Sequence, residues 1–210
     1  MDLLMHPGYF PNCISMACLV QEKVTWETCD NYQKQTYRNR CYIATDRGRL
    51  MLNIPIQHVG GSTGRQKYRD VRLENSYPWQ RQHWRSLETA YRAAPFFEYF
   101  EGDLRPLFET AFTFLLDLNL ATIEQLCTLL QLPLPKERST SFEATPEGLR
   151  DARFLIEAKR KEACPVPRYT QVFQERHGFL PNLSTLDLLF NEGPAAAEYL
   201  GSIQLPWNDG

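Results

Sequence analysis

The chain has no long hydrophobic run. Nowhere do about 18 apolar residues follow one another, which is the minimum for a membrane-spanning helix. The opening residues Met1–Gly8 also lack the basic and apolar regions of a secretory signal. We therefore expect no membrane insertion and a cytoplasmic location.

An excess of positive charge is lacking too. The 23 Lys and Arg residues stand against 25 Asp and Glu residues, which gives a formal net charge of -2. Proteins that bind duplex nucleic acid need a basic surface to neutralise the phosphates, and no long basic run is present. We therefore expect no nucleic acid among the partners.

Motifs for metals and for phosphate loops are missing. The six cysteines form no Cys-x-x-Cys pair, so no zinc site is predicted, and in a cytoplasmic protein we expect reduced thiols. Residues 60–65 form a glycine-rich loop that could cradle a phosphate, but it does not end in Gly-Lys-Ser/Thr. A flexible tip is the favoured interpretation. The sequence therefore predicts neither a metal nor a cofactor.

What the chain does contain is enough apolar material for a core. It has 210 residues, of which 43% are hydrophobic and 12% are aromatic. A chain of this length buries roughly 70% of its unfolded surface when it folds as one unit. We expect a single domain over residues 1–210.

The first third of the sequence alternates between apolar and polar residues, as strands do. Residues 33–43 and 49–56 flank Asp46-Arg47-Gly48, a turn in which glycine tolerates a positive φ. These segments predict an antiparallel hairpin. Residues 70–74 alternate again and predict a third strand.

From Pro78 onwards the spacing of apolar residues becomes helical. It predicts a helix over residues 79–91 and a helical region over residues 96–116 that is interrupted at Gly102 and Pro106. A helix-rich second part therefore follows the strand-rich first part.

Two capping sequences predict further helix starts. Thr122 opens a capping box ahead of residues 123–130, and Ser184 precedes a short apolar helix. The predicted fold is α+β, with a small antiparallel sheet from the N-terminal third covered by helices from the middle and C-terminal parts.

The stretch Tyr32–Ile43 is the best candidate for a site. On a regular strand Arg38 and Arg40 share one face, because side chains alternate with a period of two. Neighbouring guanidiniums repel, and an anion lying across them removes the repulsion. That anion is either a ligand or the protein's own carboxylates, and the sequence leaves both open.

Other polar residues could complete this site. His83 is the candidate general base, since a neutral imidazole can accept a proton near pH 7. Ser86 lies on the same helix face, and His6, Tyr9 and Lys34 are further ligand-binding candidates. The alternative for His83 is a hydrogen-bonded histidine in the seam between helix and sheet. The prediction is a pocket shared by the two arginines and the helix that carries His83.

Several stretches together resemble the WbqC-like protein family. They extend over almost the whole chain and comprise His6–Pro11, Tyr32–Arg40, Leu50–Pro55, Trp79 with His83, Asp117–Asn119, Gly178–Ser184 and Asp187–Gly193. Many members of this family carry Gln where this chain has His6. The family is bacterial and archaeal, and some members are encoded in gene clusters for O-antigen and other surface polysaccharides. The resemblance therefore implies a link to the modification of sugars or sugar nucleotides.

Two classes of function remain open. The first is a transferase acting on a sugar or sugar nucleotide, with Arg38 and Arg40 on the diphosphate and His83 as base. The second is a non-catalytic protein that binds an anionic metabolite or a partner of the polysaccharide machinery. Both predict an anionic small molecule, such as a nucleotide sugar, as the ligand. The sequence does not indicate an oligomeric state.

Overall fold

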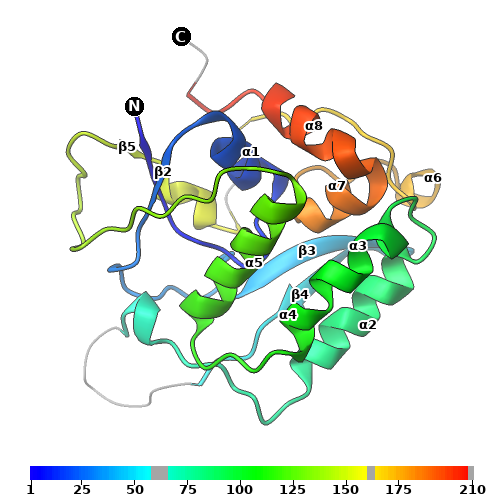
Figure 1. Ribbon diagram of the computed structural model, residues 1–210, viewed down its shortest axis with the longest axis horizontal. Coiled ribbons are helices and arrows are strands. Elements are labelled where there is room, and N and C mark those ends of the chain that lie inside the picture. Colours follow the sequence, from blue (N-terminus) through cyan, green and yellow to red (C-terminus); the bar gives the residue numbers. More distant parts are fainter. Residues whose placement is uncertain (58–65, 160–163, 208–210) are drawn as a thin grey trace.

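The computed structural model describes residues 1–57, 66–159 and 164–207, and it mixes strands with helices (Figure 1). The strands are β1 (Leu3–Met5), β2 (Val24–Trp26), β3 (Arg40–Thr45), β4 (Gly48–Asn53) and β5 (Arg150–Asp151). The α-helices are α1 (Cys13–Gln21), α2 (Trp79–Tyr91), α3 (Phe97–Leu104), α4 (Pro106–Glu109), α5 (Leu115–Leu129), α6 (Gln174–His177), α7 (Thr185–Glu192) and α8 (Ala196–Ser202). Three 3-10 helices complete the set: η1 (Tyr68–Asp70), η2 (Arg153–Ile156) and η3 (Gly193–Ala195).

The predicted α+β class is confirmed, with β3 and β4 as its small antiparallel sheet. These strands pair from Arg40 opposite Asn53 to Thr45 opposite Gly48. Gly48 has a φ of +101°, which explains why glycine closes the turn. Helices α2 to α5 lie on one side of this hairpin and α1, α7 and α8 on the other (Figure 1).

The predicted first strand of the hairpin is wrong before Arg40. Residues 33–39 form turns, in which the Thr36 hydroxyl donates to the Gln33 carbonyl and Gln35 has a φ of +62°. The segment is tied to other parts of the chain: the Tyr9 amide donates to the Tyr37 carbonyl at 2.9 Å. A left-handed residue other than glycine breaks a strand without leaving a sequence signal.

A second, parallel sheet was not predicted. Its strand order is β2-β1-β5, so that β1 is the central strand. Leu3 pairs with Val24 of β2 and with Arg150 of β5. All three residues of β1 are buried, as is usual in parallel sheets, which are covered on both faces. Strands of two or three residues are too short to show a periodicity.

Two further predictions are wrong in detail. Residues 70–74 make only isolated bridges, Arg72 to Phe114 and Leu73 to Ile56, after the 3-10 turn of η1. Thr122 does not start a helix but lies in the middle of α5, where its hydroxyl donates to the Asn119 carbonyl. The capping-box pattern is short and polar, so it also fits an exposed turn inside a longer helix.

The helical predictions are otherwise close. Helix α2 has the predicted bounds, and the Ser184 hydroxyl accepts from the Leu186 amide as the N-cap of α7. The region after residue 96 is interrupted at Pro106, as predicted, but Gly102 lies inside α3.

Among the described residues, no helix is both long and apolar enough to cross a membrane. The glycine-rich loop of residues 60–65 lies outside the described residues.

Candidate functional site

Ionisable side chains follow the strands of the parallel sheet. His6 comes directly after β1, Glu27 comes directly after β2, and Asp151 ends β5 just before Arg153. The carboxyl ends of parallel strands lie at one edge of a sheet, and open α/β sheets bind ligands in the crevice there. This edge is therefore the place to look for a site.

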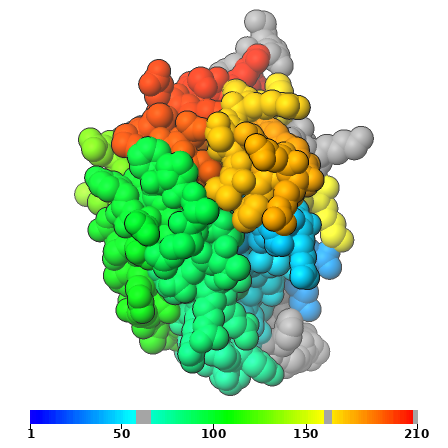
Figure 2. All heavy atoms as spheres, turned by 90° about the vertical axis from the view of Figure 1, so that its right-hand side faces the viewer, coloured from blue at the N-terminus to red at the C-terminus, as the bar shows by residue number. Residues whose placement is uncertain are grey.

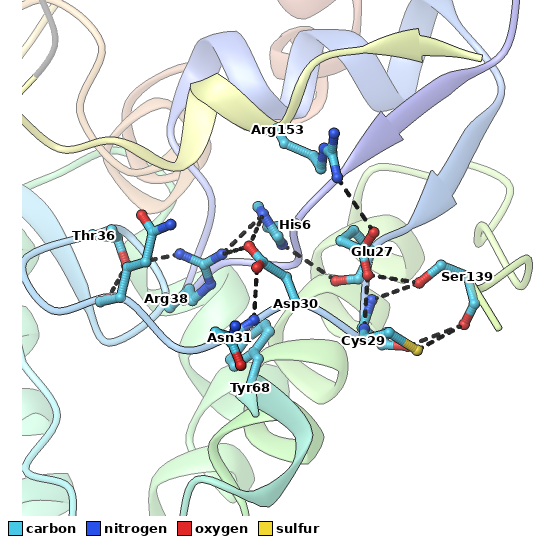
Figure 3. Close-up of polar contacts among 12 residues, drawn as sticks. His6, Glu27, Cys29, Asp30, Asn31, Thr36, Arg38, Tyr68, Ser139 and Arg153 are labelled. Carbon is cyan, nitrogen blue, oxygen red and sulfur yellow. Dashed lines mark hydrogen bonds and ion pairs between the residues drawn. The ribbon is translucent and has the colours of Figure 1, made fainter. Parts of the chain in front are cut away.

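A cleft of about 360 Å³ opens at this edge. We call it the strand-end cleft. Its lining combines three carboxylates, two guanidiniums, a histidine and two aromatic rings: His6, Asp30, Gln33, Arg38, Phe142, Asp151, Arg153, Phe154, Ile156 and Glu157. Figure 3 shows His6, Asp30 and Arg38 pointing toward one another, with Glu27 and Arg153 beyond them.

His6 is held as a neutral imidazole. Its Nε2 lies 2.9 Å from Arg38 Nη2, and its Nδ1 lies 3.3 Å from the carbonyl oxygen of Glu27. Arginine can only donate, so Nε2 must carry the lone pair, and the Nδ1 proton is donated to the carbonyl. Burial lowers the pKa of His6, the Arg38 charge adds to this effect, and the neighbouring Asp30 opposes it.

Asp30 and Arg38 form an ion pair beside this histidine. Asp30 Oδ2 lies 3.1 Å from Arg38 Nη2 and 3.2 Å from His6 Nε2. The Arg38 side chain is fully buried, whereas Asp30 keeps 12% of its side chain exposed toward the cleft. Burial opposes ionisation of Asp30, but the contact with His6, the hydrogen bond from the Asn31 amide and the Arg38 charge outweigh this and lower its pKa. Removing one partner of such a pair costs about 3–5 kcal/mol.

The backbone of Arg38 is positioned by two distant elements. Asn119 of α5 donates through Nδ2 to the Arg38 carbonyl at 2.7 Å and to the Tyr68 hydroxyl. The Tyr68 hydroxyl in turn donates to the Pro7 carbonyl, and the Arg38 guanidinium lies 5.2 Å from the centre of the Tyr68 ring. The segment before β3 is thus fastened to the residue after His6.

The far wall of the cleft is a second ion pair. Arg153 binds Asp151 with two bonds, Nη2 to Oδ2 at 2.6 Å and Nε to Oδ1 at 2.9 Å. Hydrogen bonding to Arg153 lowers the pKa of Asp151. Arg153 Nη1 also lies 3.6 Å from Oε2 of the fully buried Glu27. Glu27 Oε1 accepts from the Cys29 amide and the Ser139 hydroxyl, which fixes its orientation.

The structure brings only some of the predicted site residues together. His6 and Arg38 meet in the strand-end cleft. Arg40 starts β3 and Lys34 is exposed in the preceding turns, and neither is part of the cleft lining. Arg38 lies before β3, so the expected pair of arginines on one strand face does not form. The prediction was wrong because it assumed a regular strand from residue 33.

His83 lies elsewhere and has the structural environment named as its alternative. Its Nδ1 accepts from the Tyr9 hydroxyl at 3.0 Å, and its Nε2 donates to the Asn53 carbonyl of β4 at 3.2 Å. Burial lowers the pKa of His83 to about 4. Ser86 donates to the Gln82 carbonyl one helical turn back. His83 and Ser86 therefore do not line the strand-end cleft with Arg38.

Sequence reasoning missed Asp30, Asp151, Arg153 and Phe142 as site residues. Three of them share a position in the fold: Asp30 lies in the connection after β2, and Asp151 and Arg153 lie at or just after the end of β5. This shared position becomes visible only once the parallel sheet is recognised. The described residues contain no group of three or more His, Cys, Asp or Glu side chains arranged to hold a metal, and the six cysteines are all buried.

Comparison with known proteins agrees with the resemblance seen in the sequence. A family model, described as the WbqC-like protein family, matches residues 7–164, which include Asp30, Arg38 and Arg153. The chain is 28% identical over 219 residues to a Mycobacterium tuberculosis protein named Uncharacterized protein Rv1507c, covering 92% of this chain and 91% of that protein. No solved structure matches the chain. Because the family match spans well over half of its residues, the chain belongs to the WbqC-like protein family.

Proposed function

We propose that the chain takes part in surface-polysaccharide biosynthesis and that the strand-end cleft binds a sugar or the sugar part of a sugar nucleotide. The family supports the pathway, since some of its members are encoded in polysaccharide gene clusters. The composition of the cleft supports the ligand class. The observation that carries the proposal is that an exposed aromatic ring, Phe142, lines the same cleft as the carboxylates of Asp30, Asp151 and Glu157.

A sugar offers hydroxyl donors around its edge and an apolar C–H face. Phe142 is 48% exposed although it is a large apolar residue, and it lines a cleft whose other lining residues are mostly polar or charged. Its ring can receive the apolar face, while Asp30, Asp151 and Glu157 can accept from hydroxyls. The guanidinium of Arg153 lies 5.2 Å from the centre of the Phe142 ring and holds it at the rim.

The arginines have a supporting role in this proposal. Arg38 and Arg153 already bind Asp30 and Asp151, and the Arg38 side chain is fully buried. An anionic ligand would have to displace a carboxylate to reach Arg38. We therefore assign Arg38 to orienting Asp30 and His6, and the sugar rather than a diphosphate to the cleft.

The same cluster can serve a transfer reaction. A substrate hydroxyl that donates to Asp30 can attack the anomeric carbon of a sugar nucleotide. The bond from that carbon to the nucleoside diphosphate breaks, the diphosphate leaves with the electron pair, and the hydroxyl proton passes by way of Asp30 to His6 Nε2, 3.2 Å from Asp30 Oδ2. Arg38 must release Nε2 for this step. Its charge then favours loss of the proton from His6, which returns the site to its starting state.

A non-catalytic binding protein is the second candidate. Both ring nitrogens of His6 already have partners inside the protein, and His83 is not part of the cleft lining. On this alternative the cluster only shapes the cleft. The two candidates predict the same ligand but differ in catalysis. A transferase has a turnover rate that depends on the protonation of His6, whereas a binding protein has no turnover.

The proposal is tested by ligand-induced stabilisation. Nucleotide sugars, free hexoses and free hexosamines are screened by thermal shift, and a ligand at 100 times its Kd stabilises by about 2.7 kcal/mol. Phe142→Ala should abolish the shift. Tyr99→Ala is the matched control, because Tyr99 is an aromatic residue of α3 that is 73% exposed and lies outside the cleft.

Either of two results would contradict the proposal: no sugar compound stabilises the wild-type protein, or Phe142→Ala keeps the full shift. Once a ligand is known, His6→Gln separates the two candidates. If the protein is a transferase, the wild type turns over the ligand and His6→Gln loses that turnover. If it is a binding protein, neither form shows turnover and the variant keeps the affinity of wild type.

A further inference from the structure

A second concave surface lies at the tip of the β3–β4 hairpin. It is a groove of about 550 Å³ between the hairpin turn, the exposed side of α2 and Phe173. We call it the hairpin groove. Figure 2 faces this side of the molecule, where the cyan hairpin, the green α2 and the orange segment before α6 adjoin. It shares no lining residue with the strand-end cleft.

The groove carries positive charge that the described residues do not neutralise. Arg47, Arg49 and Arg85 line it, and none of them has an ion pair within the described part of the chain. The one carboxylate in the lining is Asp46, whose Oδ2 is 3.7 Å from Arg176 Nη1. This arrangement contrasts with Arg38 and Arg153, each of which binds a carboxylate.

One of these arginines is held in place. Arg49 Nη2 donates to the Pro181 carbonyl at 2.8 Å, and its guanidinium lies 5.5 Å from the centre of the Tyr42 ring. Its other N–H groups remain able to donate. Thr89 adds a hydroxyl to the lining, while Phe173 and the 38% exposed Leu50 add apolar surface. At least one of the three guanidiniums is therefore held in a defined position, and the groove also offers a hydroxyl and apolar surface.

We propose that the hairpin groove binds a phosphate-bearing ligand. Guanidiniums match phosphate oxygens with paired donors, and three arginines line this one concavity. A multivalent anion in the groove would meet three positive charges that have no carboxylate partner in the described part of the chain. The inference does not rest on the proposed sugar site, because it uses different residues and a different chemistry.

Calorimetric titration with sodium pyrophosphate at low ionic strength tests the inference. Wild type should bind, and Arg47→Ala and Arg85→Ala should each weaken binding about tenfold, the typical loss of one charge-assisted contact. Arg85→Lys should restore part of it. Arg69→Ala, an exposed arginine of η1 outside the groove, is the matched control and should bind as wild type. Phe142→Ala should also bind normally, which separates this site from the sugar site.

Vesicles decide between a soluble phosphate and a lipid headgroup as the source. If vesicles of phosphatidylglycerol, but not of phosphatidylcholine, bind the wild type and lose binding in Arg47→Ala and Arg85→Ala, the natural ligand is a lipid phosphate. Binding of pyrophosphate alone assigns a soluble ligand. Absence of both interactions, or equal weakening by Arg69→Ala, would overturn the inference.

Discussion

At the residue scale, two buried histidines show how the protein fixes a protonation state. His6 is neutral because Arg38 donates to its Nε2, and His83 is neutral because it accepts from Tyr9 while donating to the Asn53 carbonyl. In both cases burial is the largest cause of a lowered pKa. The two sites differ in access to the strand-end cleft, since His6 lines it and His83 does not. The same residue type therefore serves a candidate site in one place and the seam between α2 and β4 in the other.

Acid should weaken the fold through His83. Its pKa is about 4 in the folded protein against 6.5 ordinarily, so below pH 6.5 the unfolded chain binds a proton that the folded chain does not. The stabilisation is complete above pH 6.5 and is lost as the pH falls to about 4, by about 3 kcal/mol in all at about 1.4 kcal/mol per pH unit.

Urea unfolding at pH 7 and pH 4.5 measures this effect. His83→Gln should show a smaller loss of unfolding free energy between the two pH values than wild type. His177→Gln controls for the removal of a histidine as such, because His177 is only partly buried at the end of α6. An identical pH dependence in wild type and His83→Gln would refute the argument.

The sequence identified Arg38 and His6 but not their neighbours. Arg38 was noticed because of its spacing to Arg40, although the strand on which that spacing depended begins two residues later. The actual partner of both Arg38 and His6 is Asp30, which lies in the connection after β2. Arg153 reaches the cleft because it follows β5 of the parallel sheet. Side-chain chemistry indicated which residues could act, whereas tertiary structure decided which of them meet.

At the element scale, the length of each helix or strand determined how well it could be predicted. Helix α2 extends over 13 residues with one apolar face, and its bounds agree with the prediction. The hairpin has six residues in each strand and a glycine turn, and its pairing was also found. Strands β1, β2 and β5 have three, three and two residues, which give no alternation to detect.

Two glycines should respond in opposite ways to alanine. A Cβ at either Gly48 or Gly102 meets nothing within 4 Å, so only the backbone differs. Gly48 has a φ of +101° and Gly48→Ala should lower the unfolding free energy by about 1 kcal/mol. Gly102 lies inside α3, and Gly102→Ala should raise it by about 0.5–1 kcal/mol. Chemical denaturation of the two variants beside wild type measures both changes in unfolding free energy. If both changes had the same sign, the backbone explanation would be contradicted.

At the scale of the whole molecule, the strand-end cleft is assembled from distant parts of the chain. His6, Asp30 and Arg38 come from the N-terminal part, and Phe142 and Arg153 come more than one hundred positions later. The parallel sheet joins these parts because β5 pairs with β1. A change far along the chain can therefore alter the surroundings of His6.

Hydrogen exchange should reveal how well β1 is held. The Leu3 amide donates to the Lys23 carbonyl at 2.8 Å, and the Leu4 carbonyl accepts from Ala152. Amides of residues 3–5 should therefore exchange as slowly as those of α5, although they lie near a chain end. Residues 140–149 are mostly exposed and have no regular element, so their amides should exchange fast. Mass spectrometry of peptides from both segments measures the difference, and fast exchange of residues 3–5 would show that the parallel sheet is weak.

The strand order β2-β1-β5 also has a consequence during synthesis. β1 leaves the ribosome first, and β2 can pair with it soon afterwards, but the opposite edge of β1 stays open until residues 150–151 have emerged. Translation adds about 5–20 residues per second, so this edge waits for many seconds. During that time the nascent chain carries an apolar, unpaired strand, which is a target for chaperones and for mispairing. The strand-end cleft consequently cannot form before residues 150–157 have emerged.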